Sequence, residues 1–299
     1  MPAGGWERDF CSSRPRPALS PHRANEDNET PLFHLLEYLH MLKSEQQHRE
    51  EIVHVGRMMY DRGWIAGSDG NVSVRLDAGR ILATPTGVSK GAMQPQDLIV
   101  CDLAGNKLSG ERERTTEMPM HVAVYQDRPD IHAVVHAHPP TATGFAVAGK
   151  ALNQGILPEL IVAFGSVPLA DYGLPGTPAL VEGMLPFIPK YNAILLANHG
   201  AVAYDEDLAH AFGRMETVEH LARITLVAEM LGGAKLLPRT EIAKLFASRA
   251  RYGVHVPNQF EPGSPLAAED VPESNEKLEV TRQQLIALID EAMRVRGVV

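Results

Sequence analysis

The sequence is poor in cysteine and has no long apolar run. Its two cysteines, Cys11 and Cys101, form no CxxC pair, which argues against a disulfide framework. Cys101 follows the apolar run Leu98–Val100, so we expect it to be a small core residue. No apolar run approaches the ~18 residues that span a bilayer, and residues 1–30 lack the apolar region of a signal peptide. We therefore expect a protein without membrane contacts, located in the cytoplasm.

Positive charge is also scarce. The chain has 28 lysines and arginines against 37 aspartates and glutamates, a formal net charge of −9. Because an acidic chain repels the nucleic-acid backbone, we do not expect nucleic-acid binding. A local basic patch can still hold phosphate, so a phosphorylated substrate remains open. The 299 residues, 44% of them hydrophobic, can bury a substantial core in one large domain or two small ones.

Composition divides the chain into three parts. Residues 1–30 are rich in Pro, Ser and Arg, and we interpret them as a disordered tail. A transit peptide is a weaker alternative, because such peptides avoid acidic residues. Residues 31–253 contain the periodic segments and form the main domain. Residues 254–299 combine a charged, proline-containing linker with an amphipathic helix.

Apolar periodicity and turn residues predict mixed secondary structure. The first helix covers 31–62, with a break or an exposed stretch between 43 and 51. Three short strands follow, and their connections are too short for crossover helices, which indicates an antiparallel sheet. Strands are predicted at 72–76, 80–83, 98–102, 131–138, 193–197 and 201–204. Helices are predicted at 116–126, 141–147, 178–187, 205–231 (with Asp205 as N-cap) and 240–248, and residues 169–177 are predicted to form a loop. The fold class is therefore α/β or α+β.

Three histidines have the spacing of metal ligands. His136 and His138 are two apart in a predicted strand, so their rings lie on one face. Two exposed histidines at a sheet edge are the alternative. His199 ends an apolar strand just before Gly200, a position where α/β proteins bind ligands, although a lone histidine there is more often structural. Together they supply three ligands and leave one position open, as catalytic zinc sites do.

A second group of polar residues opens the predicted helix 116–126. The hydroxyls of Thr115 and Thr116, with the N–H groups of a helix start, can hold a phosphate, but either residue can also be an N-cap. Glu117 follows them and can act as a general base or as a metal ligand. His121 lies one turn later, and we favour a buried structural role for it, or a role in supporting the metal ligands without touching the metal.

Two glycine-containing segments offer further donors. Gly70–Ser73 lies between the first helix and the first strand, and Thr84–Gly87 follows the second strand. Small residues, free backbone N–H groups and a hydroxyl or amide are what an oxyanion site uses, although each segment alone predicts only a turn.

Five motifs in order resemble the class II aldolase/adducin family. They are GNVSVR at Gly70, TPTG at Thr84, RTTEMPMH at Arg114, AVVHAH at Ala133 and LLANHGAVA at Leu195. The resemblance covers about residues 51–253. It implies a three-layer α/β/α fold around a mixed, mostly antiparallel sheet. It also implies a homotetramer with sites between subunits.

The resemblance further implies residue roles. The zinc ligands of the family match His136, His138 and His199, and its acidic catalytic residue matches Glu117. Its phosphate-binding positions match Asn71, Thr86, Gly87, Thr115 and Thr116, where threonines replace the usual pair of serines. Aldolases of the family carry glutamate at the position of Glu117 and epimerases carry aspartate, so an aldolase is favoured.

The expected activity is zinc-dependent cleavage or formation of a C–C bond in a sugar phosphate, such as a ketose 1-phosphate, through a metal-stabilised enediolate. One position departs from the family. Fuculose-phosphate aldolases use a tyrosine as proton donor where an ungapped alignment places Leu157, and Glu159, Tyr172 or Tyr252 are the candidate replacements. The alternatives are an epimerase, a dehydratase or a decarboxylase on the same scaffold, or a non-catalytic adducin-like interaction module.

Overall fold

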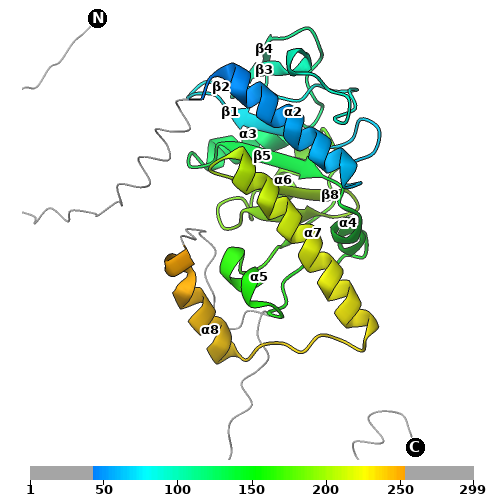
Figure 1. The fold of residues 1–299 in the computed structure, drawn as a ribbon, viewed down its shortest axis with the longest axis vertical. Coiled ribbons are helices and arrows are strands. Elements are labelled where there is room, and N and C mark those ends of the chain that lie inside the picture. Colours follow the sequence, from blue (N-terminus) through cyan, green and yellow to red (C-terminus); the bar gives the residue numbers. More distant parts are fainter. Residues whose placement is uncertain (1–42, 253–299) are drawn as a thin grey trace, which may run out of the picture. The chain divides into compact units, whose positions relative to one another are not determined.

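The computed structural model describes residues 43–252 (Figure 1). The predicted tail 1–30, residues 31–42 of the first predicted helix, the linker and the C-terminal helix lie outside the described residues. Among the helices of the described part, none combines the length and apolarity needed to cross a membrane.

Eight strands in the described part form one sheet, in the order β4-β3-β2-β1-β5-β8-β7-β6. All neighbours are antiparallel except β6 and β7, which are parallel. The sheet is therefore mixed and mostly antiparallel, as the sequence predicts. The strands are β1 (Asn71–Arg75), β2 (Arg80–Ala83), β3 (Ile99–Asp102), β4 (Lys107–Ser109), β5 (Ala133–Ala137), β6 (Leu169–Ala170), β7 (Ala193–Leu196) and β8 (Gly200–Asp205).

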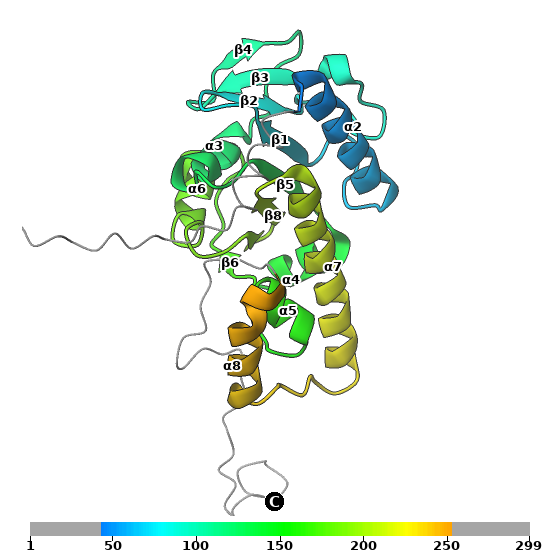
Figure 2. The same ribbon diagram turned by 60° about the vertical axis from the view of Figure 1, so that its left-hand side comes forward.

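Helices cover both faces of this sheet (Figure 2). On one face of the sheet, the strand side chains form a core cluster with α2, α4 and α7. On the other face, they form a second core cluster with α3 and α6. This is the expected three-layer α/β/α arrangement, because strands buried on both faces need a helix layer on each. The helices are α2 (Glu45–Asp61), α3 (Met118–Asp127), α4 (Pro140–Val147), α5 (Pro158–Ala163), α6 (Pro178–Met184), α7 (Leu208–Met230) and α8 (Arg239–Ser248), with short 3₁₀ turns at Pro95–Asp97 and Arg249–Tyr252.

The centre of the sheet sets up the site. β5 is buried along its whole length between β1 and β8, and its register pairs His136 with Asn71 on β1. Ala133, Val135 and Ala137 pack in the core cluster that contains α7, whereas Val134 packs in the cluster that contains α3. Because side chains alternate along a strand, His136 lies on the same face as Val134, which is the α3 face of the sheet.

The structure changes several predicted boundaries. Of the break or exposed stretch predicted between 43 and 51, the structure shows the exposed stretch, since Ser44 and Gln47 form the capping box that opens α2 at Glu45 and all of these residues but His48 are exposed or half-buried. Asp205 is not the N-cap of α7. Asp207 is, with its side chain accepting from the His210 N–H, while Asp205 binds Arg214. The predicted loop 169–177 contains β6, and the sequence did not predict β4 or α5, because these elements are too short to show periodicity.

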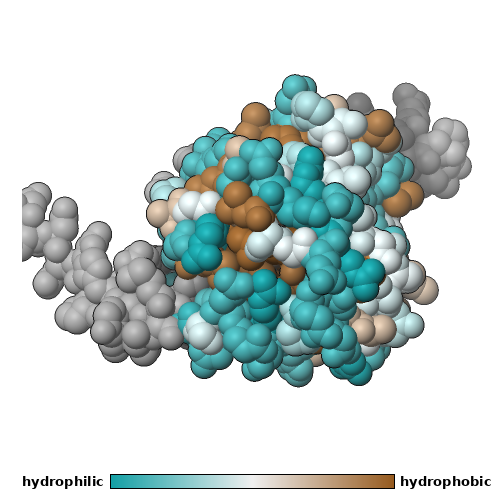
Figure 3. Space-filling model, turned by 90° about the horizontal axis from the view of Figure 1, so that it is seen from above, coloured by the Kyte–Doolittle hydropathy of each residue, from teal (hydrophilic) through white to brown (hydrophobic). Residues whose placement is uncertain are grey.

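The exposed parts of the fold differ in character. β4 is a three-residue edge strand and all its residues are exposed, which limits pairing with other chains. Figure 3 looks onto this end of the molecule, which is mostly hydrophilic with small hydrophobic areas. The end of α7 instead exposes apolar side chains, namely Leu226 (45%), Val227 (54%), Met230 (78%) and Leu231 (83%).

A buried carboxylate ties α7 to the start of α4. Glu219 is 2% exposed. Its oxygens accept from the backbone N–H groups of Thr141 and Ala142, from the Thr141 hydroxyl at 2.8 Å and from Arg223 Nε at 2.9 Å. These contacts satisfy free N–H groups at the helix start and place a negative charge at its positive end.

Replacing Glu219 should therefore destabilise the fold. We expect Glu219→Ala to lower the free energy of unfolding by about 2–4 kcal/mol, because it leaves several buried donors without acceptors. Glu216→Ala is the matched control on the same helix, since that residue is 51% exposed in a surface pair with Arg62. It should cost less than about 1 kcal/mol. Equal losses in urea unfolding would contradict the assigned cap.

Candidate metal centre

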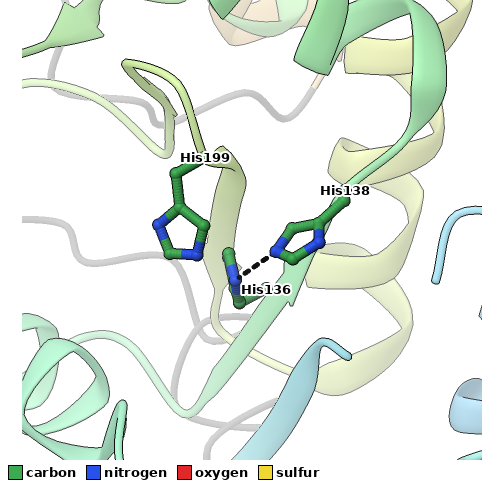
Figure 4. Close-up of side chains that lie close together, drawn as sticks. All are labelled: His136, His138 and His199. Carbon is green, nitrogen blue, oxygen red and sulfur yellow. Dashed lines mark hydrogen bonds between the residues drawn. The ribbon is translucent and has the colours of Figure 1, made fainter. Parts of the chain in front are cut away.

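Three imidazole rings converge on the α3 face, at the end of β5. His136, His138 and His199 point toward one another, and each offers one nitrogen within 4.8 Å of the others (Figure 4). Their ring centroids lie 4.7–5.1 Å apart. The sequence prediction that these residues come together is therefore correct in geometry.

His136 has its tautomer set by the sheet. Its side chain is 0% exposed, and its Nδ1 lies 2.9 Å from the carbonyl oxygen of Ala201, to which it can only donate. The unprotonated Nε2 is then free as a ligand. Burial lowers the pKa of His136 to about 3, so the ring is neutral at pH 7, as metal binding requires.

His138 is placed differently from the prediction. β5 ends at Ala137, one residue earlier than expected, so His138 lies beyond the strand. Its N–H leaves the sheet ladder and donates to Trp64 O at 2.9 Å. Its Nε2 nevertheless lies 3.2 Å from that of His136, and its Nδ1 faces the Asp69 carboxylate at 3.7 Å. A carboxylate behind a ligating imidazole orients the ring and raises its basicity.

A tight turn between β7 and β8 presents His199. Asn198 has φ 55°, a conformation that asparagine tolerates better than most residues, and the His199 N–H closes the turn on Leu196 O. The next residue must be glycine, because a Cβ at Gly200 would lie 2.6 Å from both a backbone oxygen and His138 Cδ2. The close approach of the two histidine segments therefore depends on Gly200.

Glu117 lies among these rings. Its Oε1 is 3.1 Å from His199 Nε2 and its Oε2 is 3.4 Å from His136 Nε2. Zn–N bonds of 2.0–2.1 Å at tetrahedral angles place two ligand atoms about 3.3–3.4 Å apart. The separations of 3.1 Å and 3.4 Å from the Glu117 oxygens, and of 3.2 Å between the Nε2 atoms of His136 and His138, lie near that spacing. The residues therefore fit a divalent ion, with Glu117 placed as a fourth ligand or beside the open position.

The charge on Glu117 is held by its neighbours. Burial alone would raise the pKa of Glu117, but the hydrogen bonds that its carboxylate accepts from His199 and the Asn71 amide outweigh burial, so the pKa lies below its usual range. Asn71 Nδ2 donates to Glu117 Oε2 at 2.7 Å. Glu117 is the N-cap position of α3 rather than part of its first turn, and neither threonine before it is the cap. The Glu117 N–H instead donates to Thr115 Oγ1 at 3.2 Å.

The predicted phosphate-binding residues lie on adjoining segments. Asn71 begins β1 rather than a loop, and its Nδ2 lies 3.5 Å from Thr115 Oγ1. The segment of Thr86 and Gly87 runs beside residues 113–114, through a bridge at Pro85 and a bond from the Thr86 N–H to Glu113 O. Thr86, Gly87 and Thr116 are exposed, whereas Asn71 and Thr115 are buried. The exposed donors suit an entering anion, and the buried ones are already engaged.

The buried Lys90 near the site was not predicted. Lys90 is 2% exposed and its Nζ donates to the carbonyl oxygen of Ser68. Burial lowers its pKa to about 8, against the opposing charges of Asp69 and Glu117. A lysine in a turn-rich segment normally predicts a solvated charge, so the sequence gives no signal for it. His121 is 1% exposed, in agreement with the expected buried role.

Comparison with known proteins gives consistent matches. Residues 50–226 match the family described as class II aldolase and adducin N-terminal domain. A 3-oxo-tetronate 4-phosphate decarboxylase from Pectobacterium atrosepticum is 34% identical over 210 residues, which are 68% of this chain and 94% of the relative. A 5-deoxy-D-ribulose 1-phosphate aldolase from Bacillus thuringiensis serovar kurstaki is 33% identical over 211 residues, which are 70% and 98% of the two chains.

A solved structure of an L-fuculose 1-phosphate aldolase superposes with a TM-score of 0.65 at 31% identity, covering 72% of this chain and 99% of that one. Proteins similar to this chain over nearly their whole length are thus named for different reactions.

The histidine geometry predicts metal binding. We expect about one divalent ion per chain after reconstitution with Zn²⁺, and loss of that ion in a His136→Ala/His138→Ala double variant, because too few ligands then remain. Metal analysis of the dialysed protein measures both. His210→Ala is the control, since His210 is exposed and pairs with Asp207 at the start of α7. Metal-free wild-type protein, or an unchanged ion content in the double variant, would contradict this site.

Proposed function

The chain belongs to the class II aldolase and adducin family, and we propose that it is a metal-dependent lyase acting on a phosphorylated sugar. It breaks or forms the C–C bond next to the substrate carbonyl. The observation that supports this most directly is the Glu117 carboxylate, held beside three convergent imidazoles and next to hydroxyl and amide donors on adjoining segments. Retro-aldol cleavage of a ketose 1-phosphate is the first candidate reaction.

The three histidines would hold the ion as neutral ligands. His136 is held by Ala201 O, so its ring keeps its orientation without substrate, and the Asp69 carboxylate lies 3.7 Å from His138 Nδ1. When bound, a Zn²⁺ ion supplies Lewis-acid stabilisation of the negative charge that develops on the substrate carbonyl oxygen. The side chains need little rearrangement, which lowers the cost of reaching the transition state.

Glu117 moves the proton. Its carboxylate takes the proton from, or returns it to, the substrate carbon that becomes nucleophilic in the condensation direction. Asn71 fixes one carboxylate oxygen, and the His199 ring lies against the other. An ionised carboxylate with a fixed direction is the form that a general base needs.

The phosphate is bound away from the reacting carbon. Thr86, Gly87 and Thr116 offer exposed donors, whereas Asn71 and Thr115 are buried. Binding energy at the phosphate then orients the carbonyl toward the histidines.

Decarboxylation of a phosphorylated 3-oxo sugar acid is the second candidate. Retro-aldol cleavage needs an acid for the departing aldehyde oxygen, whereas loss of CO₂ needs none at that position. Leu157, where fuculose-phosphate aldolases have tyrosine, is an apolar residue that packs against the core. Tyr172 is 60% exposed and Glu159 is also exposed, so both are open to solvent as donors, while Tyr252 lies at the end of the described residues. The similarity to a 3-oxo-tetronate 4-phosphate decarboxylase supports the same alternative.

One assay panel tests both reactions. Ketose 1-phosphates are screened for dihydroxyacetone phosphate and aldehyde, and 3-oxo-4-phospho sugar acids for CO₂, with zinc-loaded and chelated protein. Turnover on either set that chelator removes supports the lyase proposal, and the set that reacts identifies the bond. Activity that survives chelation, or no turnover on either set, would overturn it.

Glu117→Gln should retain metal and fold but reduce kcat by about 10²-fold or more, because the amide keeps the shape and cannot accept the proton. The measurement is kcat on the best substrate of the panel, with metal content and melting temperature alongside. Glu113→Gln is the matched control, since this residue is four positions away and pairs with Lys107 at the surface. Full turnover by Glu117→Gln would leave Glu117 without a role in proton transfer.

The proposed pocket also predicts a preference for phosphorylated substrates. Thr116→Val should reduce binding of the phosphorylated substrate by roughly 1–3 kcal/mol, because the lost hydroxyl partners a charge. The comparison is kcat/KM for a phosphorylated substrate and its free analogue. Thr240→Val, an exposed threonine on α8, should leave both unchanged. A wild type without phosphate preference would remove the case for a phosphate site.

A further inference from the structure

A chain of hydrogen bonds runs from the interior of the protein to Glu117. The Tyr125 hydroxyl lies 2.9 Å from Ser73 Oγ, which lies 2.7 Å from His121 Nδ1. On its other side, His121 Nε2 contacts Asn71 Oδ1, and Asn71 Nδ2 donates to Glu117 Oε2 at 2.7 Å. Four consecutive contacts therefore join five side chains.

Two elements supply all members behind Glu117. Asn71 and Ser73 are alternate residues of β1, so both side chains face α3. His121 and Tyr125 are one helical turn apart on α3, so both face β1. These four side chains are at most 3% exposed. Water is thus excluded, and each polar atom depends on its neighbour in the chain.

The polarity of the chain follows from its charged end. An ionised carboxylate only accepts hydrogen bonds, so Asn71 must turn its NH₂ toward Glu117 and its oxygen toward His121. His121 Nε2 must then carry the proton, which leaves Nδ1 to accept from the Ser73 hydroxyl. Ser73 in turn accepts from Tyr125. One tautomer and one amide orientation satisfy every contact.

Burial supports this arrangement. The pKa of His121 falls to about 4, so its ring is neutral at pH 7, with one donor and one acceptor. Burial raises the pKa of Tyr125 well above its usual value, so the phenol keeps the proton that it donates. Arg75 fixes the far end, since its guanidinium lies 4.9 Å from the centre of the Tyr125 ring and donates to Tyr125 O at 2.6 Å.

We propose that His121, Ser73 and Tyr125 are positioning residues that fix the Asn71 amide and, through it, the direction of the Glu117 carboxylate. For its effect on turnover this inference rests on the proposed function. Without the His121 donor, the buried Asn71 oxygen loses its hydrogen-bond partner, and the Asn71 amide group can rotate by about 180°. Its oxygen would then face the carboxylate and repel it.

The first test does not depend on activity. In zinc-loaded protein labelled with ¹⁵N-histidine, NMR at pH 7 should show His121 as the Nε2–H tautomer. An Nδ1–H tautomer, or a protonated ring, would overturn the assigned direction of the chain. Failure of the lyase proposal leaves this result unaffected, so the two failures can be distinguished.

The second test uses the polarity of the replacement. His121→Phe removes both contacts and should lower kcat by about 10–10²-fold with little change in KM, as expected when a catalytic group is misplaced. His121→Gln can donate with its NH₂ and accept with its oxygen, so it should recover most of the loss. Equal activity of the two variants would overturn the proposal.

The last test is a double-mutant cycle with Glu117→Gln. If His121 acts only through Glu117, His121→Phe should lower kcat less than about twofold further in the Glu117→Gln background. The same fold-loss in both backgrounds means a general structural role and overturns the proposal. Val124→Ala, a buried α3 residue outside the chain, is the control and should reduce stability without lowering kcat. If His121→Phe does not fold, Ser73→Ala replaces it, with an expected loss of about 3–10-fold and unchanged metal content.

Discussion

The pairing of β5 between β1 and β8 is the constraint on which the candidate site depends. It sets His136 opposite Asn71 and aims its Nδ1 at Ala201 O, so one strand fixes both a ring of the candidate metal site and its tautomer. A slip of one residue would turn His136 into the α7 core cluster and bring an alanine to the site. The apolar residues of β5 on both faces oppose such a slip, because it would also exchange the side chains that face each helix layer.

The site combines groups that are costly to bury separately. Neutral imidazoles lose little on burial, whereas an ionised carboxylate needs partners. Glu117 has them in His199 and Asn71, and its N–H is bound by Thr115. The same contacts serve both candidate reactions, because aldol cleavage and decarboxylation each leave negative charge next to a carbonyl. What separates the two reactions is an acid for the leaving group, and that depends on residues outside this cluster.

The parts that the sequence predicts are those with local signals. The apolar run before His136 predicts a buried strand, and the glycine after His199 predicts a turn. The sequence does not predict β6, because two residues have no periodicity and pair only through the neighbouring strand. It misplaces the N-cap of α7, because Asp205 and Asp207 have equal intrinsic preference and tertiary contact with Arg214 decides between them.

The sequence also does not predict which side chains of different elements contact one another. Ser73 follows Asn71 on one strand face and Tyr125 follows His121 on one helix face, so each pair has a periodic signal. Only the packing of α3 on β1 shows that the pairs interlock. Lys90 gives no local signal, since its burial depends on α2 packing over it at Gly56.

The tight turn that presents His199 also bears on the order of folding. It is the most C-terminal segment of the cluster, and its place beside His136 depends on the pairing of β7 with β8 and of β8 with β5. A chain growing from its N-terminus therefore has its carboxylate and first two imidazoles long before the third. Pairings between distant segments form late, since loop closure must be overcome first. An ion would thus bind the finished fold rather than nucleate it, and its binding free energy would act mainly by slowing unfolding.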